Sequence, residues 1–212
     1  MKLFSRAMSY VAKCVDVEYQ IRDEKFLQEQ GGAIIIGNHQ SSLDTLALCH
    51  IWNAVKYAIT VIIKKELFYA LPFGPSAYLA GVIFINRNNS RSAYKELQEI
   101  KERMVNQKVK IWFFPEGTRN EEYTKLLPFK KGAFNLAVEA QVPIIPVVMS
   151  PYYFVNNKKC IFNKGHVVIQ CLEPVPTAGL TRDDVPALIK ICYDKMTVAC
   201  KELSKEIFDT NL

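Results

Sequence analysis

The sequence predicts an α/β fold, in which a largely parallel mixed sheet is flanked by helices and includes a late antiparallel hairpin section. Three observations support this prediction. Short apolar runs without polar alternation, such as residues 33–36 and 144–149, are typical of strands buried on both faces. Longer stretches with apolar residues at helical spacing, such as residues 90–105, separate these runs. Two short strand-like stretches joined by Asn156 and Asn157 favour a hairpin.

Size and composition fit one compact domain with an anionic partner. The chain has 212 residues, of which 50% are hydrophobic, and a domain of this size buries about 70% of its unfolded surface. Lysine and arginine total 27 against 21 acidic residues, giving a net charge of +6. This balance suits an anionic partner or plain solubility. The sequence has no basic block with interleaved aromatic residues, so no nucleic-acid partner is expected.

Residues 1–17 are expected to form an amphipathic helix ahead of the main domain, residues 18–212. Leu3, Phe4, Ala7, Met8 and Val11 share one helical face. Such a helix either packs on the domain or lies in a membrane interface, and both alternatives remain open. The first six residues lack the continuous apolar core of a signal peptide.

The cysteines and the longest uncharged run give two further expectations. The six cysteines have neither Cys-x-x-Cys nor metal-ligand spacing, which predicts buried, reduced thiols in a domain that faces the cytosol, with no metal site. The run at residues 67–85 carries no charge, but Pro72, Gly74, Pro75 and Gly81 interrupt it. We therefore expect a buried strand at its end and no membrane span.

Each strand is expected from its own local pattern. Residues 15–21 alternate between apolar and polar side chains, as a half-buried strand does. The later strands are mainly apolar runs bounded by glycine, proline or charged residues. In chain order, the main expected strands cover residues 15–21, 33–36, 56–63, 82–85, 109–114, 144–149 and 165–172.

The helices follow from apolar residues at helical spacing. The helix over residues 90–105 also carries Glu99 and Arg103 as an i,i+4 pair. The last helix has Pro186 in a first turn that Asp183 or Asp184 can cap. In chain order, the expected helices cover residues 43–51, 66–71, 90–105, 131–140 and 185–207.

The loop at residues 37–42 carries the first candidate chemistry, because it joins a buried strand to a helix. One of Ser41 or Ser42 is expected to cap that helix, which places Asp44 near its positive end. An ionised Asp44 can hold one ring nitrogen of His39 and leave the other free to accept a proton. A helix cap beside a surface histidine is the alternative, and this stretch alone does not exclude it.

Two other strand ends supply groups suited to a phosphate. Gly117, Thr118 and Arg119 directly follow the strand at residues 109–114, and loops in that position gather at the ligand-binding edge of α/β sheets. A guanidinium with neighbouring backbone N–H groups can grip a phosphate. Arg87 lies just beyond another strand, and residues 142–148 are expected to form an apolar wall. Lys64 and Lys65 are expected either to help hold the phosphate or the CoA, or to lie at a solvated strand end.

Together these stretches resemble the four motifs of the glycerolipid acyltransferases, in the same order, and resemble the 1-acylglycerol-3-phosphate acyltransferases most. The matching stretches are residues 38–44, 81–87, 114–119 and 142–148. The resemblance implies that His39 is the catalytic base and Asp44 its partner. It also implies that the phosphate and glycerol of the acceptor are bound by Arg87, Glu116, Gly117, Thr118 and Arg119. Family members usually carry hydrophobic membrane segments before the first motif, whereas here only the helix of residues 3–15 precedes it.

The implied reaction moves a fatty acyl group from acyl-CoA to the free hydroxyl of 1-acylglycerol 3-phosphate (lysophosphatidate), giving phosphatidate. The thioester already has a good leaving group, a thiol of pKa about 8.5, so the acceptor hydroxyl can attack once His39 takes its proton. Acyl-CoA is then a co-substrate, and no cofactor is expected. The resemblance also implies association with a membrane surface, at the endoplasmic reticulum with the domain facing the cytosol.

Three alternatives remain open from the sequence. The acceptor can be glycerol 3-phosphate or another lysophospholipid. The same base can activate water, which would make the protein a thioester or lipid hydrolase. A lipid-binding module without catalytic activity is the third alternative.

Overall fold

The structure, a computed structural model, describes residues 16–71, 73–85, 90–120, 122, 125–156 and 161–210. The expected N-terminal helix lies outside these residues, and so do Arg87, Cys14 and Cys160.

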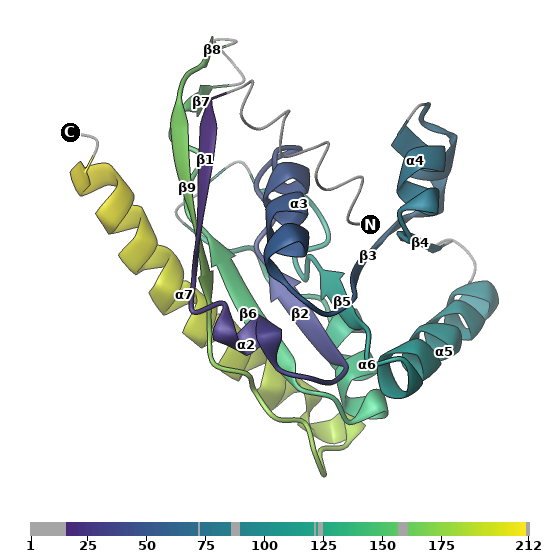
Figure 1. The fold of residues 1–212 in the computed structure, drawn as a ribbon. Helices are drawn as coiled ribbons and strands as arrows, with labels where there is room; N and C mark the ends of the chain where they lie inside the picture. Colours follow the sequence, from purple (N-terminus) through teal and green to yellow (C-terminus); the bar gives the residue numbers. More distant parts are fainter. Residues whose placement is uncertain are drawn as a thin grey trace.

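The described residues contain a seven-stranded sheet of order β1-β9-β6-β2-β5-β3-β4 (Figure 1). Strand β2 pairs in parallel with β5 and β6, and β3 pairs in parallel with β4 and β5. The antiparallel pairing of β6 with β9 reverses the direction at one side, and β1 runs parallel to β9. A separate antiparallel pair, β7 and β8, confirms the late hairpin. The strands are β1 Val17–Arg22, β2 Ala33–Gly37, β3 Ile59–Lys64, β4 Ile83–Ile85, β5 Lys110–Phe113, β6 Ile144–Met149, β7 Val155–Asn156, β8 Ile161–Phe162 and β9 Gly165–Cys171.

Helices cover both faces of this sheet. The α-helices are α2 Lys25–Gln28, α3 Asp44–Ala54, α4 Phe73–Leu79, α5 Ser90–Asn106, α6 Gly132–Ala140 and α7 Val185–Thr210, with short 3-10 helices η1 Lys65–Tyr69 and η3 Arg182–Asp184. Helices α5, α6 and α7 pack on the face to which β2 contributes Ile34 and Ile36. Helices α2, α3 and α4 pack on the opposite face, to which β2 contributes Ala33 and Ile35 (Figure 1). A mostly parallel sheet with helices on both faces confirms the predicted α/β fold, and β2 accordingly buries successive residues on alternate faces.

Three local expectations differ from the structure. The strand expected from Lys56 begins three residues later, at Ile59. The final helical segment is capped by Thr181 rather than by an aspartate N-cap: Asp184 accepts the Thr181 N–H and hydroxyl in a capping box. The hairpin strands are shorter than expected, and Asn156 belongs to β7 rather than to the turn.

The segment between β3 and β4 differs most. A single helix was expected at residues 66–71, but the chain forms η1 and then α4, which begins just after Pro72. Gly74 permits this arrangement, because a Cβ at this position would overlap the carbonyl oxygen of Phe68 in η1. Close packing of the two short helices therefore accounts for a glycine that the sequence pattern marked only as an interruption. None of the described helices has the length and apolar composition needed to cross a bilayer.

Candidate active site

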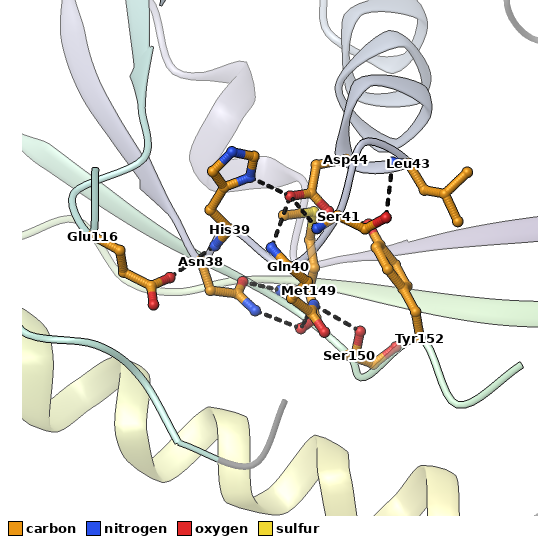
Figure 2. Close-up of polar contacts among 10 residues, drawn as sticks. All are labelled: Asn38, His39, Gln40, Ser41, Leu43, Asp44, Glu116, Met149, Ser150 and Tyr152. Carbon is orange, nitrogen blue, oxygen red and sulfur yellow. Dashed lines mark hydrogen bonds and ion pairs between the residues drawn. The ribbon is translucent and has the colours of Figure 1, made fainter. Parts of the chain in front are cut away.

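The candidate site lies where the adjacent parallel strands β2 and β5 end (Figure 2). The loop after β2 carries His39 and leads into α3, which begins at Asp44. The loop after β5 carries residues 114–120. Because both strands run in the same direction, their following loops meet at one edge of the sheet.

The structure brings His39 and Asp44 together. The distance from His39 Nδ1 to Asp44 Oδ2 is 2.5 Å, and the same oxygen accepts the N–H groups of Gln40 and Ser41 at 2.9 and 3.2 Å. The Asp44 residue is 1% exposed, whereas 22% of the His39 side chain is exposed. An oxygen that accepts two backbone N–H groups acts as an acceptor toward His39 as well. The ring nitrogen Nε2 is then free to accept a proton.

The expected serine cap of α3 is absent from this loop. The N-cap residue is Leu43, which has no side-chain cap bond, and the Ser41 hydroxyl accepts the Leu43 N–H at 3.3 Å instead. The Asp44 carboxylate satisfies the amide groups just before the helix, so the aspartate both organises the loop and holds the histidine.

The backbone of His39 is held by the loop after β5. Its N–H donates to Glu116 Oε1 at 2.8 Å, and its carbonyl accepts the Asn120 N–H at 2.7 Å. The imidazole stacks on the Phe114 ring, with 4.1 Å between the ring centroids and 20° between the planes. The position of His39 is thus set by both loops.

Glu116 faces inward, although the resemblance implied that it binds the acceptor. It is 3% exposed, and its second oxygen, Oε2, accepts the Leu127 N–H at 2.9 Å. Burial raises the pKa of this carboxyl, while the hydrogen bonds from His39 and Leu127 act in the opposite direction. Its neighbours Gly117, Thr118 and Arg119 line the cavity described below, and Glu116 does not.

Two buried amides hold the histidine loop against β6, and the sequence analysis did not identify this role. Asn38 accepts the Met149 N–H at 2.8 Å and donates to the Met149 carbonyl at 3.0 Å. Gln40 donates to the carbonyls of Met149 and Ser150, each at 3.0 Å. The signal in the sequence was the pair of amide side chains that flank His39 (Figure 2).

His39 and Asp44 line a cavity of about 970 Å³. Lys64 and Arg119 also line it, and neither forms an ion pair within the described residues. The apolar lining residues come from α3, β3, η1, α4, the approach to β4 and the end of β5: Leu48, Trp52, Val61, Ile62, Ile63, Leu67, Ala77, Val82, Phe113 and Phe114. A cavity with a base, two cations and a long apolar wall fits an amphipathic, anionic ligand.

The sequence analysis expected residues 142–148 to form the apolar wall of the site, and this expectation is wrong. None of these residues lines the cavity. Strand β6 is buried along its whole length beside β2, and it supports the site through its hydrogen bonds to Asn38 and Gln40. Residues 67–78 contribute Leu67 and Ala77 to the wall.

Gly117 has a positive φ of 72°, and Lys130 packs directly against it. A Cβ at residue 117 would lie 2.6 Å from Lys130 Nζ. The Lys130 N–H also donates to the Pro115 carbonyl at 2.8 Å. Glycine at this position therefore permits both the turn and the close lysine, a role for Lys130 that the sequence analysis did not identify.

No thiol in the described residues is suited to nucleophilic attack. Cys49, Cys171, Cys192 and Cys200 are buried, and burial raises the pKa of the Cys49 thiol to about 12. In the described part of the chain, no three side chains of the His, Cys, Asp or Glu type gather as metal ligands do.

The fold and the site together define a class of protein. It is an α/β protein whose histidine–aspartate pair lines a mainly apolar cavity at the carboxyl ends of parallel strands. Residues 18–150 match the family model described as Acyltransferase. The chain belongs to this acyltransferase family.

Two relatives support this membership, and one solved structure has a similar fold. The chain is 45% identical over 190 residues to the human 1-acyl-sn-glycerol-3-phosphate acyltransferase beta, covering 89% of this chain and 67% of the relative. It is 36% identical over 196 residues to the 1-acyl-sn-glycerol-3-phosphate acyltransferase of Haemophilus influenzae, covering 92% and 78% of the two chains. The fold is similar to that of the 1-acyl-sn-glycerophosphate acyltransferase PlsC from Thermotoga maritima, with a TM-score of 0.67, 22% identity, and coverage of 93% of this chain and 82% of that one.

Proposed function

We propose that the protein transfers a fatty acyl group from acyl-CoA to the free hydroxyl of 1-acylglycerol 3-phosphate. The observation that carries the proposal is the position of the His39–Asp44 pair, which lines a cavity with an apolar wall and two unpaired cations. The names of the relatives at 36–45% identity support the same acceptor.

His39 acts as the general base in the proposed mechanism. The Nε2 atom takes the proton from the acceptor hydroxyl, and the hydroxyl oxygen forms a bond to the thioester carbonyl carbon. The tetrahedral intermediate then breaks its C–S bond, and the CoA thiolate leaves with the proton that His39 had taken. General-base help of this kind contributes about 10²–10⁴ in rate, and correct placement of both substrates contributes the remainder.

Asp44 and Glu116 position His39 in this mechanism. Asp44 holds Nδ1 and stabilises the imidazolium that forms during proton transfer. Glu116 holds the backbone N–H of the same residue, so its contribution is indirect. No protein nucleophile is needed, because the acceptor supplies the attacking oxygen.

Gly117, Thr118 and Arg119 are proposed to bind the phosphate and glycerol of the acceptor, together with Arg87, while Lys64 adds charge at the same cavity. Arg119 and Lys64 are exposed and unpaired within the described residues, so each can contact an anion. Acyl-CoA serves as a co-substrate, and no cofactor is required.

We also propose that the protein works at a membrane surface and that residues 1–17 contribute to its attachment as a segment ahead of the domain at 18–212. The proposed location is the cytosolic side of the endoplasmic reticulum. The buried free thiols of Cys49, Cys171 and Cys192 are compatible with a reducing compartment.

An acceptor screen on the purified full chain tests the proposal. Release of CoA from radiolabelled acyl-CoA is measured alone and with lysophosphatidate, glycerol 3-phosphate or lysophosphatidylcholine. We expect labelled phosphatidate and CoA release only with lysophosphatidate, and loss of both in His39→Ala. Equal CoA release without any acceptor would instead identify a thioester hydrolase, and full activity in His39→Ala would refute the mechanism.

A further inference from the structure

Exposed apolar side chains gather on one short segment of the molecule. Ten large hydrophobic residues are exposed among the described residues, and five of them lie within residues 67–79. We call these five the η1–α4 surface: Leu67, Tyr69, Leu71, Tyr78 and Leu79, with exposures of 42%, 74%, 81%, 62% and 84%. Single exposed apolar residues are ordinary, but a cluster on consecutive elements marks an interaction site.

The chemistry of this segment matches a lipid interface. Tyrosine and leucine side chains project from η1, α4 and the residues between them, while the exposed Lys64 and Lys65 lie at the start of η1. Glu66 follows them, and no further charged residue occurs up to Ile85. Tyrosines at headgroup level, aliphatic side chains below and lysines beside them are typical of surfaces that bind anionic bilayers.

The η1–α4 surface continues into the candidate active site. Leu67 belongs to both, and Ala77, two residues before Leu79, is buried in the wall of the cavity. In Figure 1, α4 stands at the β4 edge of the sheet, apart from the α5–α7 layer. An acyl chain that passes from a bilayer to His39 therefore has an apolar surface beside the cavity wall.

We infer that the η1–α4 surface docks on an anionic phospholipid membrane, with Leu71 and Leu79 among the lipid acyl chains and Lys64 and Lys65 at the headgroups. This inference deepens the proposed function, since it names the surface through which a lipid acceptor reaches the site. The η1–α4 segment then lies parallel to the membrane surface, as other amphipathic membrane-binding elements do.

Depth-dependent fluorescence quenching tests the contact directly. Trp52 and Trp112 are 7% and 0% exposed, and Trp52 lines the cavity, so the signal of the wild-type protein in the same vesicles is subtracted and Leu79→Trp then reports its own surroundings. In vesicles of phosphatidylcholine and phosphatidic acid, we expect a blue shift and strong quenching by brominated acyl chains for Leu79→Trp. The control Val198→Trp lies on α7, where Val198 is 57% exposed, and should show neither. Equal behaviour of the two variants would overturn the inference.

Quenching is measured at one residue because residues 1–17 are also proposed to attach the full chain to vesicles, so vesicle binding alone would not distinguish the two segments. A paired charge variant, Leu71→Asp with Leu79→Asp, extends the test to function. Both side chains are more than four-fifths exposed, so the fold should be unaffected, as circular dichroism checks. We expect activity toward lysophosphatidate in vesicles to fall by about tenfold or more, while activity toward a monomeric short-chain acceptor stays unchanged. The control pair, Val105→Asp with Val198→Asp, adds the same charge elsewhere and should retain both activities.

The outcomes separate this inference from the proposed function. If the wild type is inactive but Leu79→Trp is quenched, the docking surface is supported and the proposed reaction is refuted. If the wild type is active but Leu79→Trp is not quenched, only the docking surface is refuted. A dimer that the Leu71→Asp, Leu79→Asp pair converts to a monomer, with no quenching at residue 79, would assign this surface to a second copy of the chain and overturn the inference.

Discussion

At the scale of single residues, His39 is fixed in place by contacts to several different parts of the residue. Asp44 contacts its ring nitrogen Nδ1, and Phe114 stacks on its ring face. Glu116 accepts its backbone N–H, and the Asn120 N–H donates to its carbonyl. Within the described residues, no such contact is made to Nε2, the nitrogen that accepts the proton in the proposed mechanism. Preorganisation of this kind lowers the cost of reaching a reactive geometry.

Asp44→Asn separates orientation of His39 from organisation of the loop. An asparagine oxygen can still accept the N–H groups of Gln40 and Ser41, so the fold should be retained, but the charge that stabilises the imidazolium is lost. In the serine protease triad, the analogous change lowers kcat by about 10⁴, and we expect a loss of similar order here. Measured kcat with an unchanged melting temperature checks this. A loss below about tenfold would reduce Asp44 to a structural role.

Glu116→Gln tests the assignment of this residue to positioning. A glutamine amide can accept only one of the two N–H bonds from His39 and Leu127, and its NH₂ group would face the other donor. We expect a loss of about 1–3 kcal/mol in the free energy of unfolding, with kcat reduced and the KM for the acceptor nearly unchanged. Urea denaturation and initial rates measure these quantities. Glu122→Gln, an exposed change in the same loop, is the control. A selective rise in KM for the acceptor would return Glu116 to acceptor binding.

His50 makes stability depend on pH. It is half-buried and stacks on Tyr19, with 5.5 Å between the ring centroids, and burial lowers the pKa of its imidazole. The unfolded chain, with an ordinary histidine pKa of about 6.5, then binds more protons than the folded chain. Stability is therefore full above this value and falls as the pH drops below it toward the folded-state pKa.

We expect His50→Phe, which keeps the stacked ring, to lose less stability than the wild type as the pH falls through this window. Urea denaturation at a series of pH values measures the difference, with His166→Phe as the matched control. Parallel pH profiles for the wild type and His50→Phe would show that another group governs acid sensitivity.

At the scale of secondary-structure elements, β2 leads directly from the buried core into the loop that carries His39. Its last residue, Gly37, directly precedes the loop, and a Cβ there would overlap the fully buried indole of Trp112 in β5. The glycine thus allows the two strands that carry the site to pack against each other.

Gly37→Ala should therefore destabilise the protein by about 1–3 kcal/mol, the usual cost of overpacking a core. It should also lower activity, because Trp112 packs near Phe114, on which His39 stacks. Thermal denaturation and initial rates are the measurements. Gly132→Ala is the control, since nothing lies within 4 Å of a Cβ at that position of α6. Equal stability of the two variants would mean that Trp112 can move aside.

At the scale of the whole molecule, the cavity exists only because separate elements surround it. Its apolar wall combines residues from α3, β3, η1, α4 and the end of β5, while His39 and Asp44 come from the β2–α3 connection. The length of acyl chain that fits is therefore a property of the assembled fold.

Ala77→Phe should shift the acyl-chain preference toward shorter donors. Ala77 is 1% exposed and lines the cavity from α4, so a phenyl group there fills part of the apolar space. We expect kcat/KM for palmitoyl-CoA relative to octanoyl-CoA to fall by about tenfold or more. Val82→Ala enlarges the same wall and should not favour the shorter donor. An unchanged ratio in Ala77→Phe would place the acyl chain elsewhere.

Much of the fold and of the site chemistry could be predicted from local patterns. The central strands were recognisable because strands buried on both faces are continuously apolar. The nearness of His39 to Asp44 followed from a strand–loop–helix connection of five residues. The roles of Glu116, Asn38 and Gln40 could not be predicted, because their hydrogen-bond partners lie as far as 111 residues away in the chain.

By itself, the sequence determined the α/β class, the order of its central elements and the presence of a histidine beside a carboxylate. These depend on short-range periodicity and on neighbours along the chain. Only the tertiary structure decided that Glu116 faces inward, that β3 and α4 rather than β6 form the apolar wall, and that the η1–α4 surface stays exposed. The physical reason is that the burial of a side chain depends on which distant elements pack against it, and local sequence does not specify that packing.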